Sequence, residues 1–121
     1  MKLWSAILVS SLVLVAGVAQ AKGNTVKTGS VQYACQSGKK VSVSYGFNKQ
    51  GLPTYASAKI GGRARMMPIN LALSSTAGTT FGGENRYMLG TDAMDSKNYR
   101  SLPMMITAPN NQIQFKECNP I

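Results

Sequence analysis

Residues 31–47 read VQYACQSGKKVSVSYGF, and apolar side chains alternate with polar or small ones along both halves of this stretch. Because successive side chains of a β-strand point to opposite faces, a period of two is typical of half-buried antiparallel strands. The QSGK segment at residues 36–39 between the two halves is rich in turn-forming residues. The stretch therefore predicts two strands joined by a short turn, and an all-β fold.

The rest of the chain predicts more strands of the same kind. Gly61 and Gly62 are typical of a tight hairpin turn, and the short connections favour strands that pair in sequence order as a meander. About eight strands in so small a chain can cover their edges by curling into a flattened antiparallel β-barrel, and a two-sheet sandwich is the alternative. Beyond the first two strands, we expect strands at residues 55–60, 63–69, 79–82, 86–90, 100–107 and 112–117.

The first 21 residues have the features of a secretory signal peptide. Lys2 provides a positive start, residues 3–16 are almost entirely apolar, and residues 19–21 read AQA, a small-residue cleavage site. A membrane anchor is the alternative, but the apolar run is shorter than the roughly 20 residues that a bilayer requires. We therefore expect a single domain at residues 22–121, without a membrane span, in the periplasm, at the outer-membrane surface or secreted.

The chain has two cysteines, Cys35 and Cys118, and export places them where thiols oxidise. We expect them to form a disulfide that fastens the first strand to the last and contributes roughly 4 to 5 kcal/mol to stability. Ile113 and Phe115 share one strand face, whereas Cys118 has the opposite parity. A bulge or a strand end must therefore come before Cys118.

The composition argues against most enzymes. The chain has no histidine, which excludes Ser-His-Asp triads, Cys-His pairs and imidazole metal sites. Its four carboxylates are Glu84, Asp92, Asp95 and Glu117, and the two aspartates lie in a predicted loop where capping of turns is their expected role. We expect no catalysis, no metal and no cofactor.

The formal net charge is +9, and the lysines and arginines are scattered along the chain. Because export excludes most nucleic acid, this charge favours anionic glycans, acidic protein clefts or a membrane surface as partners. The methionine pairs at residues 66–67 and 104–105 should each point one side chain to the core and one outward. The alternative for the outward methionines is an apolar rim at a homodimer contact.

The mature sequence resembles the bacterial adhesin complex protein family over nearly its whole length. The matching segments are GKKV at residues 38–41, YGFNKQGL at 45–52, TYASA at 54–58, MP at 67–68, YMLGT at 87–91, MITAP at 105–109, NQI at 111–113, FK at 115–116 and Cys118. The resemblance implies an exported, surface-exposed small β-barrel that is similar to inhibitors of c-type lysozyme and is also described as an adhesin.

The resemblance also implies where a lysozyme would bind. The wider inhibitor family places a serine of one loop and a lysine of another in the enzyme cleft. Its Ser-Gly-x-x-Tyr pattern falls on residues 83–87, where Tyr87 matches and a glycine replaces the serine; the second loop is residues 95–100. The expected lysozyme-binding residues are Ser96, Lys97, Tyr99, Arg100, Gly83, Arg86 and Tyr87.

Three functions follow from these observations. An inhibitor would plug the cleft of a c-type lysozyme and pair a cation with the enzyme's two carboxyl groups, which protects the bacterial cell wall. An adhesin would bind anionic host glycans or host-cell receptors through many basic side chains, with a steep dependence on salt. An envelope protein would bind peptidoglycan or lipopolysaccharide. The resemblance favours the inhibitor.

Overall fold

The computed structural model describes residues 24–121, so the predicted signal peptide at residues 1–21 lies outside the described residues. Each strand begins and ends close to a turn or a short 3-10 helix. The elements are β1 (Lys27–Ala34), η1 (Gln36–Gly38), β2 (Lys40–Phe47), β3 (Pro53–Ile60), β4 (Arg63–Pro68), β5 (Thr79–Gly82), β6 (Met88–Thr91), η2 (Tyr99–Ser101), β7 (Met104–Thr107) and β8 (Ile113–Pro120).

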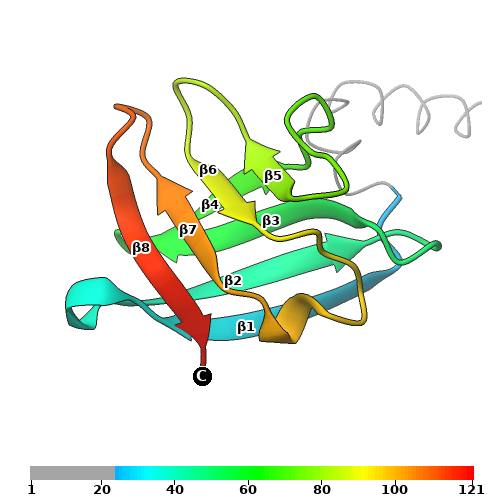
Figure 1. Ribbon diagram of the computed structural model, residues 1–121, viewed down its shortest axis with the longest axis horizontal. Coiled ribbons are helices and arrows are strands. Elements are labelled where there is room, and N and C mark those ends of the chain that lie inside the picture. The colour runs from blue at the N-terminus through cyan, green and yellow to red at the C-terminus, as the bar shows by residue number, and fades with distance from the viewer. Residues whose placement is uncertain (1–23) are drawn as a thin grey trace, which may run out of the picture.

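The strands form one antiparallel sheet in the order β4-β3-β2-β1-β8-β7-β6-β5. Two four-stranded meanders therefore meet at the β1–β8 pair, and Figure 1 shows β5 to β8 crossing over β1 to β4. The outer strands approach each other where Ile69 bridges to Phe81 and the Asn70 N–H donates to the Thr80 carbonyl at 2.8 Å. The result is a nearly closed barrel, which confirms the predicted fold class.

Two predicted strand boundaries were wrong because turns replace the strand there. The strand expected from residue 100 begins at Met104, since Tyr99–Ser101 forms η2 and Pro103 has no N–H for a ladder. The strand expected from residue 86 begins at Met88, because Asn85 has a φ of 61° and the Arg86 N–H donates to the Gly83 carbonyl at 3.2 Å. Both turns carry residues that are expected from the sequence to bind a partner.

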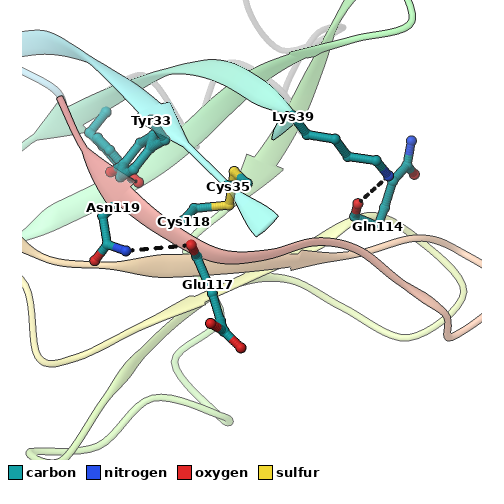
Figure 2. The surroundings of a disulfide bond; sticks show 8 residues. Tyr33, Cys35, Lys39, Gln114, Glu117, Cys118 and Asn119 are labelled. Carbon is teal, nitrogen blue, oxygen red and sulfur yellow. Dashed lines mark hydrogen bonds between the residues drawn. A yellow bond between two sulfur atoms is a disulfide. The ribbon is translucent and has the colours of Figure 1, made fainter. Parts of the chain in front are cut away.

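The predicted disulfide joins Cys35 to Cys118 across 83 residues of sequence. It lies where the end of β1 meets β8 (Figure 2). The predicted irregularity is also present, since Met104 pairs with Cys118 whereas Ile106 pairs with Phe115, which leaves an extra residue on β8. Glu117, in this bulge, has a φ of 50°. The bulge allows both Phe115 and Cys118 to face the interior.

The interior is filled by alternate residues of the strands and by an aromatic cluster. The Tyr45 ring lies 5.7 Å from Phe81 between centroids, so aromatic side chains join the two meanders. The methionine pairs alternate as expected, with Met67 and Met104 buried and Met105 exposed. Tyr33 and Tyr45 are fully buried, and their hydroxyl oxygens are 2.7 Å apart.

Loss of the disulfide should lower the free energy of unfolding by about 4 to 5 kcal/mol, because the bond removes the closure entropy of a long loop from the unfolded chain. We expect the Cys35→Ser/Cys118→Ser double variant to unfold at a much lower urea concentration than the oxidised protein. The reduced wild-type protein, measured in dithiothreitol, should match the double variant. Equal unfolding midpoints for oxidised and reduced protein would contradict this prediction.

Stability should fall as pH rises above about 10. Burial raises the pKa of the Tyr33 and Tyr45 hydroxyls above the ordinary value of 10.0, so the folded protein keeps protons that the unfolded chain loses. Each tyrosine then lowers the free energy of unfolding by about 1.4 kcal/mol per pH unit. We expect the free energy of unfolding, measured by urea titration from neutral pH to about pH 11, to fall less steeply with pH in Tyr33→Phe than in wild type. Parallel declines would refute the assignment.

Candidate functional site

The connection after β6 contains a loop that its own side chains hold in shape. The Asp95 Oδ1 atom accepts hydrogen bonds from the backbone N–H groups of Lys97 and Asn98 at 2.8 and 2.9 Å. In return, the Asn98 Oδ1 atom accepts from the Asp95 N–H at 2.8 Å. This reciprocal arrangement resembles a capping box and pairs three backbone donors. We call residues 95–101 the capped loop.

The capped loop is anchored to the barrel at two points. Tyr99 is 3% exposed, and its ring lies 4.9 Å from the Phe47 ring between centroids. Its hydroxyl occupies the space above Gly29 of β1, where any side chain would collide with it. The Ser96 N–H donates to the Gly51 carbonyl at 2.9 Å, which ties the loop to the β2–β3 turn. The loop therefore has a fixed position relative to the core.

The two cations of the capped loop have different surroundings. Arg100 donates from Nη1 to the Ser30 carbonyl of β1 at 3.2 Å, and its guanidinium lies 4.9 Å from the centre of the Tyr99 ring. These contacts hold the arginine against the barrel wall. Lys97 is held through its backbone N–H, and its side chain is exposed. The geometry thus presents the Lys97 ammonium to solvent on a rigid loop.

An apolar groove lies beside the capped loop. It has a volume of about 240 Å³, and its walls include Leu52, Leu71 and Met94. Leu52 and Leu71 are 53% and 78% exposed, and because both line this groove they form a contiguous apolar surface. Met94 of the groove directly precedes the capped loop. Leu52 of the groove follows Gly51, whose carbonyl accepts the hydrogen bond from the Ser96 N–H. The groove and the capped loop therefore form one surface.

The other predicted loop lies elsewhere. Residues 83–87 form the β5–β6 turn, where Arg86 is exposed and Tyr87 packs its ring 5.3 Å from the Arg65 guanidinium. This turn precedes β6 and the capped loop follows it, so the two lie at opposite ends of that strand (Figure 1). The structure therefore brings together Ser96, Lys97, Tyr99 and Arg100, and separately Gly83, Arg86 and Tyr87.

Sequence reasoning missed the long-range contacts of these residues. The spacing of Asp95 and Asn98 is a local capping pattern and could be recognised, as could a turn-forming role for Asp95. By contrast, the contact of Arg100 with Ser30 joins residues 70 positions apart. Over residues 24–121, no cluster of His, Cys, Asp or Glu side chains forms a metal site. In the same range, no helix has the length and apolar character needed to cross a membrane.

The fold and the site define a class: small antiparallel β-barrels, fastened by one disulfide, that carry their polar side chains on rigid surface loops. Residues 29–120 match the family model described as the ACP-like domain, Nm-ACP, and the chain belongs to this family. Among solved structures, it is similar to the Adhesin Complex Protein from Neisseria meningitidis, with 56% identity and a TM-score of 0.75 over 78% of this chain and 100% of that chain. A comparison with curated proteins gives no match. The family resemblance expected from the sequence is therefore confirmed.

Replacing Asp95 by alanine should loosen the capped loop without unfolding the barrel. Two backbone N–H groups lose their acceptor, so we expect a loss of about 1 kcal/mol in stability. Amide hydrogen exchange at residues 96–101 should become faster, whereas exchange in β2 and β3 should not change. Asp92→Ala, which removes an exposed carboxylate from the same connection, is the matched control. Equal exchange rates in both variants would contradict the capping role.

Proposed function

We propose that this protein is an exported inhibitor of c-type lysozyme that inserts the capped loop into the enzyme's active-site cleft. The observation that carries the proposal is the exposed Lys97 side chain on a loop fixed by Asp95 and Tyr99. The expected signal peptide and the similarity to an adhesin complex protein support a position at the cell surface or beyond it. The protein would act by binding and would protect the cell wall.

Charge pairing in the cleft explains how one lysine could matter. A c-type lysozyme works with two carboxyl groups that face each other across a groove. When the capped loop excludes water from this groove, the Lys97 ammonium meets negative charge in a medium where the attraction is poorly screened. Because such lysozymes are themselves basic, long-range attraction is absent and complementarity must be local. We therefore expect inhibition to survive moderate salt.

The rigidity of the loop supports tight binding. A loop that is already ordered loses little conformational entropy when it enters a cleft. Asp95 and Asn98 fix its backbone, and the buried Tyr99 ring fixes its direction. In this proposal Arg100 braces the loop from outside, through Ser30 and the Tyr99 ring.

The apolar groove favours a protein as the partner. Protein interfaces combine an apolar centre with a polar rim, and exposed leucines that line a groove are suited to such a centre. Leu52 and Leu71 provide this surface next to the capped loop. The turn at residues 83–87 lies about 13 Å away across β6, a span of four residues. An interface of about 800 Å² on each partner can include this turn, so Gly83, Arg86 and Tyr87 would lie at its edge.

Replacing Lys97 by alanine should weaken lysozyme inhibition by a factor of at least about ten, because removing one partner of a water-excluded charge pair costs about 2 to 5 kcal/mol. The assay is the lysis of a peptidoglycan suspension by a c-type lysozyme, with oxidised inhibitor at stoichiometric concentration and about 0.15 M salt. Lys49→Ala, which removes an exposed lysine from the neighbouring turn, should inhibit like wild type.

Two results would overturn the proposal at different levels. Failure of the folded, oxidised wild-type protein to inhibit would exclude lysozyme as the partner. Full inhibition by Lys97→Ala, together with its unchanged near-ultraviolet circular dichroism, would show that the capped loop does not fill the cleft.

A further inference from the structure

Arginines occupy the core-facing side of β4 next to the β3–β4 turn. Residues that pair directly across antiparallel strands point to the same face of the sheet. Arg65 pairs with Ala58 and Arg63 pairs with Ile60, and both of these partners are buried. The two arginines thus continue the inward-facing row that contains the buried Met67.

Arg65 is held in place but not fully paired. Its guanidinium lies 5.3 Å from the centre of the Tyr87 ring, which fixes the side chain by a cation–π contact. Its Nε–H is buried and, among residues 24–121, has no hydrogen-bond acceptor. A buried donor without an acceptor is uncommon, because folding removes it from water without compensation. Because the Nε atom is covered, Arg65 adds its charge to this surface without offering that donor to a ligand.

The β5–β6 turn, which contacts Arg65 through Tyr87, carries a third arginine. Arg86 is exposed and directly precedes Tyr87, whose ring contacts Arg65. Arg63 is also exposed. Glu84 is an exposed carboxylate in the same turn and offsets part of the positive charge. We call Arg63, Arg65 and Arg86 the arginine cluster.

We propose that the arginine cluster binds the oxyanion groups of an acidic glycan. A guanidinium is a planar fork that pairs with a sulfate or carboxylate through two parallel hydrogen bonds, and the exposed Arg63 and Arg86 present two such forks to solvent. Arg63 and Arg65 are two residues apart on one strand face, a separation of about 7 Å. This spacing suits a chain with successive negative charges better than a single ion.

This site is distinct from the capped loop. It lies at the other end of β6, and its cations come from β4 and the β5–β6 turn. Glycan binding at the arginine cluster therefore does not depend on lysozyme inhibition by Lys97. Arg86 is the one shared residue, because the turn that carries it would also lie at the edge of the lysozyme interface.

The test is isothermal titration of the full mature protein with three probes: a heparin-derived octasaccharide, an oligomer of sialic acid and inorganic phosphate. Arg63→Gln/Arg86→Gln should weaken binding of the octasaccharide or the sialic acid oligomer at least tenfold. The matched control is Lys27→Gln/Lys49→Gln, which removes the same charge from exposed lysines near the opposite end of β2, and it should change binding less than threefold. Glu84→Gln should tighten binding.

The choice between probes identifies the oxyanion. Preference for the octasaccharide would indicate sulfate groups, and preference for the sialic acid oligomer would indicate carboxylates. Phosphate binding as tight as that of both glycans would overturn the glycan assignment. Equal weakening by the two double variants would overturn the site, because it would show diffuse charge attraction.

Two further variants separate this site from misfolding and from lysozyme binding. Arg65→Lys keeps the charge but removes the planar fork, and it should lose octasaccharide affinity while the near-ultraviolet circular dichroism stays that of wild type. The exposed Arg63 and Arg86 carry the test if this variant fails to fold. Lys97→Ala should retain octasaccharide binding. Loss of octasaccharide binding in this variant would show that the two sites are not independent.

Discussion

The covalent join between β1 and β8 is the constraint on which the rest of the structure depends. Each meander forms from neighbouring strands through short turns, whereas β1 pairs with β8 in register at Tyr33–Pro120 and Ala34–Asn119. Two residue pairs give a weak ladder, and the Cys35–Cys118 bond lies immediately beside them. The disulfide therefore keeps the two halves in register, and the bulge at Glu117 orients Cys118 to reach it.

The aromatic interior transmits this arrangement to the surface. Tyr45 contacts Phe81 of the other meander, and both Tyr45 and Phe47 contact Tyr99. Because Tyr99 belongs to the capped loop, the position of Lys97 is set by the same packing that joins the two halves. The packing of Tyr99 in the core therefore makes the capped loop rigid before it binds a partner.

The proposed sites share β6 but differ in chemistry. Next to the capped loop lie exposed leucines and one projecting lysine, a combination suited to a protein surface. At the other end, Arg65 lies against Tyr87, and its buried Nε–H lacks an acceptor within the described chain. Lys97 and the three arginines of the cluster are dispersed in the sequence, whereas the fold places them at opposite ends of β6.

The sequence by itself determined the fold class, the order of the strands, the disulfide and the need for a bulge before Cys118, because alternation, turn residues and parity are local properties. It also indicated that Asp95 would form a turn. Only the tertiary structure decided that β7 begins at Met104, that Arg100 contacts Ser30, and that Arg65 lies against Tyr87. Each of these depends on how closely distant segments approach when the barrel closes, and that distance is set by the packing of the whole core.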